Sequence, residues 1–196
     1  MPRMSRVESQ ARTREQLIDT ATTLFLRDGY FATSLTKVAD EAGFSTGAVY
    51  SNFASKSALA MVVLQRLQDI HVTGLVEAFA KHPTFEAKLT AIETWAEDAI
   101  GESGWPRLEF EFALEASQDK GLVRETIGRD RLARDLLGQI IDSQLSAHGL
   151  KPLVPAKELA RIVLSLGIGL AVQHMVDPKV SPKTLTNALR ALITKA

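Results

Sequence analysis

The sequence predicts an all-α protein. Hydrophobic residues recur every three or four positions through nearly all of the chain, which is the period of a helix with one buried face. The periodic stretches begin at Ser, Thr or Pro and several end at Gly, as capped helices do. We find no pair of alternating segments joined by a turn, so no strand pair is expected. These observations indicate about nine helices.

Composition narrows the class of protein further. The chain has 196 residues, 45% of them hydrophobic, with 23 basic and 23 acidic residues and no cysteine. This length can bury a full core, and the missing thiols exclude disulfides and thiolate metal sites. The first ten residues contain no apolar run typical of a signal peptide. The most apolar stretch, 162–172, is too short to cross a bilayer, so we expect a cytoplasmic protein without a membrane partner.

The first helix is predicted over 13–28. Thr13 and Gln16 have the spacing of a capping box, and Gly29 follows as a C-terminal cap. Its predicted inner face is Leu17, Ile18, Ala21, Leu24 and Phe25.

Two short helices follow. The first begins after Ser34 and ends at Gly43, and the second covers 46–53. Two short helices joined by a three- or four-residue turn that contains glycine form a helix-turn-helix. Ser55 is then expected to cap a long fourth helix.

The rest of the chain is predicted to be helical. The expected helices cover about 84–100, 106–117, 120–147, 155–176 and 181–196. The alternation in "LEFEF" also allows a strand, but Pro106 is typical of a first helical turn and favours a helix. We therefore expect two domains, a three-helix unit at 1–55 and a larger helical domain at 56–196.

The third predicted helix has an unusual outer face. Val49 and Phe53 are four residues apart and should face inward. The outward residues are small and uncharged: Thr46, Gly47, Ala48, Ser51 and Asn52. No Asp or Glu occurs from Ala42 to Gln68. A helix in a DNA major groove needs short polar side chains outside and apolar anchors inside, and an acidic residue there would repel phosphates.

At this point the sequence resembles a known family. The run "LTKVADEAGFSTGAVYSNFASKSAL" is similar to the DNA-binding signature of TetR-type (tetracycline-repressor-like) transcriptional regulators. The matching features are an "IA…AGVS"-like run in the second helix, a "G-x-[aliphatic]-Y-x-x-F" recognition helix and a "K-x-x-L" start of the fourth. Phe44 and Asn52 depart from the residues more common in the family.

The resemblance implies specific DNA contacts. Bases would be approached by Thr46, Gly47, Ala48, Ser51 and Asn52. The phosphate backbone would be contacted by Tyr50 and Lys56, and by the start of the second helix at Thr33, Ser34 and Thr36. Alternatives remain: Tyr50 as a packed aromatic, Lys56 as an exposed lysine, and capping for Thr33 or Ser34. The arm with Arg3, Arg6 and Arg12 would reach the minor groove or be a disordered tail.

The resemblance also implies a homodimer and a small-molecule effector. We expect the last two helices to form the dimer surface, with internal core packing as the alternative. The residues expected to line an effector cavity are aromatic or polar side chains on apolar faces: His71, Trp95, Trp105, Phe110, Glu111, Leu114 and Gln144. Each of them is also compatible with ordinary core or surface.

The function expected from these observations is a dimeric transcriptional regulator that binds a palindromic double-stranded DNA operator. We expect a repressor released by a small, largely apolar effector. The alternative is a helical ligand-binding or adaptor protein that no longer binds specific DNA. An enzyme is not expected, because the four histidines are scattered and neither a phosphate loop nor a nucleophile elbow is present. No cofactor or metal is predicted.

Overall fold

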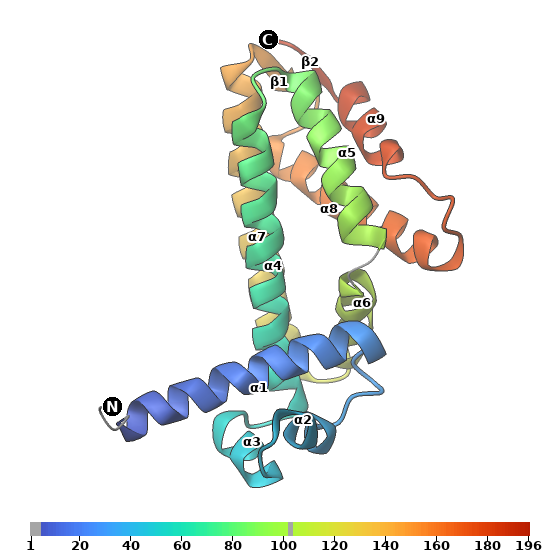
Figure 1. Ribbon diagram of the computed structural model, residues 1–196. Helices are drawn as coiled ribbons and strands as arrows, with labels where there is room; N and C mark the ends of the chain where they lie inside the picture. The colour runs from blue at the N-terminus through green and yellow to red at the C-terminus, as the bar shows by residue number, and fades with distance from the viewer. Residues whose placement is uncertain (1–4, 102–103) are drawn as a thin grey trace.

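The computed structural model describes residues 5–101 and 104–196. Within these ranges the chain forms nine helices and one two-stranded antiparallel sheet, which confirms the predicted all-α class. The elements are α1 (Arg6–Asp28), α2 (Leu35–Ala42), α3 (Thr46–Asn52), α4 (Lys56–Lys81), α5 (Phe85–Gly101), α6 (Trp105–Ala116), α7 (Lys120–Ala147), β1 (Leu150–Pro152), α8 (Ala156–Val176), α9 (Lys183–Ala191) and β2 (Ile193–Lys195). The first three helices form the lower end of the molecule, and α4 rises from them (Figure 1).

Helix α1 begins seven residues before the predicted start. Ser5 is its N-cap, and the Ser5 hydroxyl accepts a hydrogen bond from the Glu8 backbone N–H at 3.2 Å. The Glu8 carboxylate accepts one from the Ser5 N–H at 2.7 Å, which completes a capping box. The predicted box at Thr13 and Gln16 is wrong, because no helix-breaking residue separates it from this stronger upstream cap.

The helix-turn-helix boundaries agree with the prediction. The Ser34 hydroxyl accepts from the Lys37 N–H at 3.1 Å and caps α2. Gly43 ends α2 in the left-handed conformation, with φ of 73°. The Ser55 hydroxyl accepts from the Ala58 N–H at 3.0 Å in the first turn of α4.

The first hydrophobic core joins the N-terminal helices to α4 and α6. All five residues predicted for the inner face of α1 are buried: Leu17, Ile18, Ala21, Leu24 and Phe25. Leu108 and Phe112 of α6 belong to the same cluster, and their spacing of four confirms the helix rather than the strand alternative. This core therefore extends past residue 55, and the division into domains at that position stays a prediction.

A tight junction links α1 to α6. Gly104 precedes α6 with φ of 63°, and a Cβ built on it would overlap the backbone carbonyl oxygen of Leu26. Nearby, the Glu111 carboxylate accepts a hydrogen bond from the Phe31 backbone N–H at 3.1 Å. The other oxygen of Glu111 accepts from the Arg107 side chain at 2.7 Å. The N-terminal helices are thus held to the rest of the chain by close backbone packing and by a shared carboxylate.

The C-terminal segment differs from the prediction. Helix α9 ends at Ala191, and Ile193–Lys195 pairs antiparallel with Leu150–Pro152. The prediction of no strand pair was therefore wrong. Gly149, with φ of 64°, lies between α7 and β1, and β-branched Ile193 and Thr194 favour extended backbone.

Helix α8 is more apolar than a surface helix and less buried than a core helix. By length and composition alone it is able to cross a membrane, and only 22% of its most apolar window is buried within the chain. The expectation that this stretch is too short to span a bilayer does not hold for the whole helix. Most of its apolar surface therefore lies outside the core of this chain.

Candidate nucleic-acid interface and interior aromatic cluster

The inner side of α3 is fixed by two apolar anchors. Val49 is 0% exposed and Phe53 is 4% exposed, as predicted. The Arg14 guanidinium of α1 lies over the Phe53 ring, 4.4 Å from its centroid, which adds a cation–π contact. This contact of Arg14 was not predicted. Nothing in the sequence of α1 indicates which of its charged residues packs against the end of α3.

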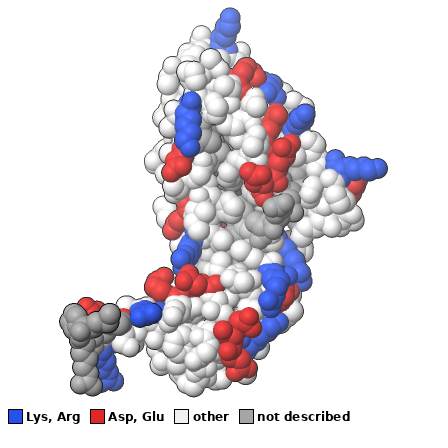
Figure 2. All heavy atoms as spheres, in the orientation of Figure 1, with Lys and Arg blue, Asp and Glu red and all other residues white. Residues whose placement is uncertain are grey.

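The outer side of α3 is uncharged and accessible. Gly47, Tyr50 and Ser51 are exposed, and Thr46, Ala48 and Asn52 are partly exposed. Figure 2 shows a surface without basic or acidic side chains at the lower end of the molecule, where α3 lies, with acidic side chains nearby. Asp40 and Glu41 are exposed on α2. The structure therefore presents the predicted base-facing residues on one accessible face.

The polar groups on this face make only local hydrogen bonds. The Ser51 hydroxyl and the Asn52 amide both donate to the Ala48 carbonyl, at 2.9 and 2.8 Å. Such bonds on an exposed helix exchange readily with other partners, because each contributes about 1 kcal/mol net. Both side chains are thus free to turn towards hydrogen-bonding groups of bases.

Tyr50 and Lys56 occupy different environments. The Tyr50 side chain is 59% exposed, so the alternative of a packed aromatic does not describe it. The Lys56 ammonium donates to the Tyr30 carbonyl at 3.1 Å and lies 4.1 Å from the Tyr30 ring centroid. Lys56 is therefore held at the start of α4 rather than loose on the surface. Its remaining donors and the nearby helix N-terminus suit a phosphate.

At the start of α2, one of the three predicted phosphate contacts does not fit. Thr33 is 1% exposed, and its hydroxyl donates to the Gly29 carbonyl at 2.8 Å. The Thr33 hydroxyl is bonded within the turn that precedes α2, so the prediction that it contacts a phosphate was wrong. Ser34 and Thr36 are exposed, although the Ser34 hydroxyl also serves as the N-cap of α2.

A charge cluster joins the end of α1 to α2. The Asp28 carboxylate accepts from Arg27 at 2.8 Å and from Lys37 at 2.9 Å. These two cations hold the pKa of Asp28 well below its usual range. Lys37 of α2 is thereby tied to the last residue of α1.

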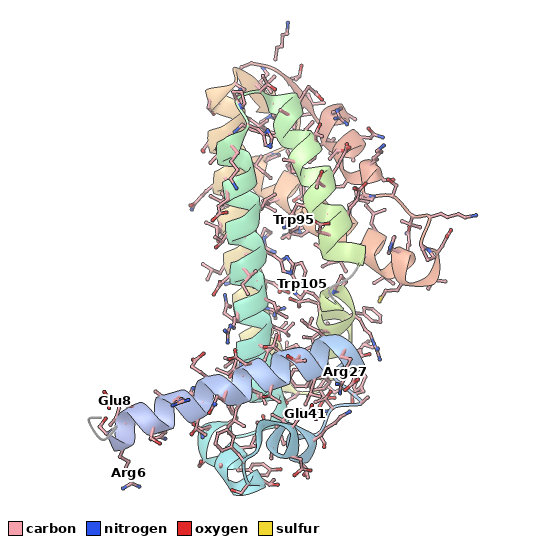
Figure 3. The ribbon with its side chains drawn as sticks, in the orientation of Figure 1. Arg6, Glu8, Arg27, Glu41, Trp95 and Trp105 are labelled. Carbon is pink, nitrogen blue, oxygen red and sulfur yellow. The ribbon has the colours of Figure 1, made fainter. Side chains whose placement is uncertain are left out.

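The predicted N-terminal arm is mostly helical. Arg3 lies outside the described residues, whereas Arg6 and Arg12 are exposed residues of α1. Figure 3 shows Arg6 and Glu8 at the far end of α1, away from the core. For Arg6 and Arg12, neither an extended minor-groove arm nor a disordered tail describes the structure.

Three of the predicted effector residues meet between α4, α5 and α6. The His71 ring of α4 stacks on Trp105 of α6, with centroids 4.0 Å apart, and meets the edge of Trp95 of α5 at 6.0 Å. Both tryptophans point towards α4 (Figure 3). Burial lowers the pKa of His71. We call His71, Trp95 and Trp105 the aromatic cluster.

A buried ion pair borders this cluster. The Trp105 indole N–H donates to one oxygen of Glu109 at 3.2 Å, and Arg129 of α7 donates to the other at 2.5 Å. Burial raises the pKa of Glu109 despite its cationic partner. The ion pair of Arg129 was not predicted, because the sequence around Arg129 does not distinguish it from an ordinary charged residue on a helix surface.

The other predicted effector residues lie apart. Phe110 and Leu114 are exposed on α6, and Gln144 is partly exposed on α7. Glu111 is committed to the junction with Phe31, so its predicted place in a cavity does not fit. Successive residues of α6 face different neighbours. The sequence pattern does not tell which neighbour each of them contacts.

Two open hollows in the described structure border α4 on another side. One measures about 290 Å³ and is lined by α1 and α4, including Asp19, Thr22 and Arg66. The other measures about 420 Å³ along α4 and shares Arg66. The predicted effector residues line neither hollow. The three residues of the aromatic cluster are each partly exposed.

Comparison with known proteins identifies the helix-turn-helix. Residues 17–61 match the family model "Bacterial regulatory proteins, tetR family". Residues 17–61 thus form a DNA-binding unit of the TetR type. This family consists of transcriptional regulators rather than enzymes. The match covers the second half of α1, all of α2 and α3, and the start of α4.

Two curated transcriptional regulators each match about half of the chain. The transcriptional activator FasR of Mycolicibacterium smegmatis is 34% identical over 99 residues, which cover 50% of this chain and 45% of FasR. The transcriptional repressor KstR2 of Rhodococcus jostii is 33% identical over 90 residues, 46% of this chain and 44% of KstR2. The chain thus spans less than half of the length of these relatives.

Solved structures extend the likeness of fold over nearly the whole chain. NemR of E. coli in its reduced form has a TM-score of 0.74 at 19% identity, with 93% of this chain and 98% of NemR covered. A TetR regulator from Haloarcula marismortui has a TM-score of 0.73 at 17% identity, covering 94% and 100%. SmeT in complex with triclosan has a TM-score of 0.60 at 20% identity, covering 89% and 85%.

Proposed function

We propose that this chain is a homodimeric DNA-binding repressor that leaves a palindromic operator when a small, largely apolar effector binds. The observation that carries the proposal is the outer face of α3. Gly47, Tyr50 and Ser51 are exposed on it, while Val49 and Phe53 are buried beneath. A helix seated in this way presents short, uncharged side chains to base edges in the major groove. Acting on DNA, the protein would work in the cytoplasm.

Dimerisation follows from the geometry of recognition. One α3 contacts only a few base pairs, and a two-fold axis places two copies about 34–36 Å apart on successive major grooves. We propose that the outer faces of α7 and α8 form the dimer surface. Exposed apolar side chains lie on both helices: Ile127, Leu132 and Leu136 of α7, and Ile168, Met175 and Val176 of α8.

The glycines of α8 support this surface. A Cβ added to Gly167 or Gly169 would meet nothing within 4 Å. Core packing within the chain therefore gives no reason for these glycines, each of which costs a helix about 1 kcal/mol relative to alanine. A helix of a second subunit that crosses closely at this point would explain why glycine occurs there.

Helix α9 contributes less than predicted. Leu185 and Leu189 are buried, against α5 and α8, in a second hydrophobic core of the same chain. The other buried residues of this core are Leu89, Ile92, Leu145, Leu159 and Leu170. We therefore place the dimer surface on α7 and α8 instead of on the last two helices.

Effector binding is proposed for the interior near the aromatic cluster. Trp105 packs against the first core, which also contains Val49 and Phe53 of the DNA-binding unit. Helix α4 runs from Lys56, at the DNA-binding end, past His71 of the cluster. A ligand that favours another packing of α4 and α6 would change the spacing of the two α3 helices, so effector and operator binding are reciprocally coupled. The structure of SmeT in complex with triclosan supports the binding of a small molecule by a protein of this fold.

The test is selection of duplexes from a random DNA pool by the purified full-length chain, followed by a mobility-shift assay. We expect enrichment of a palindrome and salt-sensitive retardation of that duplex. Enrichment of no sequence would favour the adaptor function instead. Placing the selected duplex upstream of a reporter then distinguishes repression from activation, a useful step because FasR is named an activator and KstR2 a repressor.

A further inference from the structure

The Arg129 guanidinium is buried but incompletely bonded. Its side chain is 10% exposed, and Nη2 donates to the Glu109 carboxylate. Among the described residues, Nε and Nη1 are buried without any acceptor. Native proteins rarely bury N–H donors without a partner, because such donors lose their hydrogen bonds to water. These donors therefore indicate a place for an acceptor from outside the chain.

The surroundings of Arg129 suit a small molecule. The Glu109 carboxylate joins Arg129 to the Trp105 indole, and Trp105 stacks on His71. Aromatic faces therefore adjoin a small number of fixed donors. This combination is typical of sites that bind apolar ligands with one oriented polar group.

The charges select the type of polar group. Glu109 already balances the positive charge of Arg129 in a buried setting. A carboxylate on the ligand would add a second negative charge that no described cation at the site offsets, and burying such a charge is costly. A neutral carbonyl oxygen accepts the same N–H bonds without that cost.

We propose that the effector of this protein is a neutral aromatic molecule whose carbonyl oxygen accepts hydrogen bonds from Arg129. The inference rests on the proposed function, since it specifies the ligand of the same effector site. The ligand ring takes a place against Trp105 by separating it from His71. Movement of Trp105 then shifts side chains of the first core. Because this core contains Val49 and Phe53, the position of α3 changes as well.

The inference is tested with three naphthalene probes on the full-length protein. They are methyl naphthyl ketone, ethylnaphthalene and naphthoate, which differ mainly in the polar group. Binding is followed by the NMR signal of the Trp105 indole N–H, distinguished from that of Trp95 with the variant Trp95→Phe. We expect the ketone to shift this signal and to bind about tenfold more tightly than the hydrocarbon, as one hydrogen bond from a charged donor allows.

Variants of Arg129 provide the decisive comparison. Arg129→Lys keeps a cation beside Glu109 but loses the planar donors, so the preference for the ketone should disappear. The double variant Glu109→Gln/Arg129→Met, which removes both charges, guards against misfolding from an isolated buried carboxylate and should show the same loss. Arg131→Met, at an exposed position of α7, should keep the preference.

Three results would overturn the inference: no shift of the Trp105 signal with the ketone, equal binding of ketone and hydrocarbon, or tighter binding of naphthoate. Operator binding is measured separately on the same proteins. A chain that binds its operator but not the ketone refutes this inference alone. A chain that binds the ketone but no specific duplex refutes the proposed function alone.

Discussion

The Lys56 ammonium lies 4.1 Å from the Tyr30 ring centroid and donates a hydrogen bond to the Tyr30 carbonyl at 3.1 Å. This contact ties the first turn of α4 to the turn between α1 and α2. Tyr30 itself is buried in the first core, with its ring against Phe25 and Phe112. A cation expected to contact DNA is thus anchored to the core that joins the DNA-binding unit to α6.

This anchor leads to a prediction about salt dependence. Lys56→Ala should weaken binding to all duplexes about equally and lower the slope of log affinity against log salt by roughly one, because one phosphate contact is lost. Fluorescence anisotropy over a salt series measures the slope. Lys195→Ala, in β2 at the opposite end of the molecule, is the control and should leave the slope unchanged. An unchanged slope in Lys56→Ala would remove this residue from the phosphate contacts.

The α1–α6 junction predicts unequal costs for two glycine substitutions. Gly104 and Gly149 have nearly the same φ, 63° and 64°, but only at Gly104 would a Cβ meet another atom within 4 Å, the Leu26 carbonyl among them. Gly149→Ala should cost about 1 kcal/mol through backbone strain alone. Gly104→Ala should cost roughly 2 kcal/mol more, because the clash adds to the strain. Urea unfolding of both variants measures the difference, and equal costs would show that the junction is not tightly packed.

Partial burial of His71 predicts a component of stability that depends on pH. Its pKa is lowered in the folded chain, so below the ordinary value of 6.5 the unfolded chain binds the proton more readily. The free energy of unfolding should therefore fall as the pH decreases from about 7.5 to about 5.5. His71→Phe keeps an aromatic ring and should reduce this fall. Urea midpoints at the two pH values give the comparison, and an identical fall in both proteins would contradict the prediction.

The proposed dimer surface is tested by two matched substitutions. Ile168 on α8 and Ile70 on α4 are both 58% exposed. Ile168→Glu should produce monomers, because it places a charge in an apolar contact between subunits. Ile70→Glu should remain a dimer of twice 21.4 kDa by light scattering. Should Ile168→Glu keep the dimer mass, α8 would not lie in the interface.

The sequence was most informative where local rules decide the structure. Capping residues and helical periodicity located α2 and α3 and the buried anchors Val49 and Phe53. The same rules misplaced the start of α1, because two capping signals lie on one uninterrupted helix and Ser5 rather than Thr13 closes its box.

Features that depend on distant partners were not predictable. The Thr33 hydroxyl donates to a carbonyl of the preceding turn. The Glu111 carboxylate accepts from a backbone N–H eighty residues away in the chain. The ion pair of Glu109 with Arg129 joins α6 to α7, and no pattern in either helix reveals it. The β1–β2 pair also depends on two segments that are far apart in the sequence.

The central claim is that the outer face of α3 contacts bases, and Ala48 provides its most direct test. Ala48→Glu places a negative charge on this face while leaving Val49 and Phe53 in the core. Ala113→Glu makes the same change at an exposed position of α6. We predict a loss of operator affinity of about tenfold or more for Ala48→Glu, because the charge repels phosphates and cannot pair with most base edges. Ala113→Glu should bind as the unaltered protein does. Equal operator affinity of the two variants, with both folded and dimeric, would contradict the account.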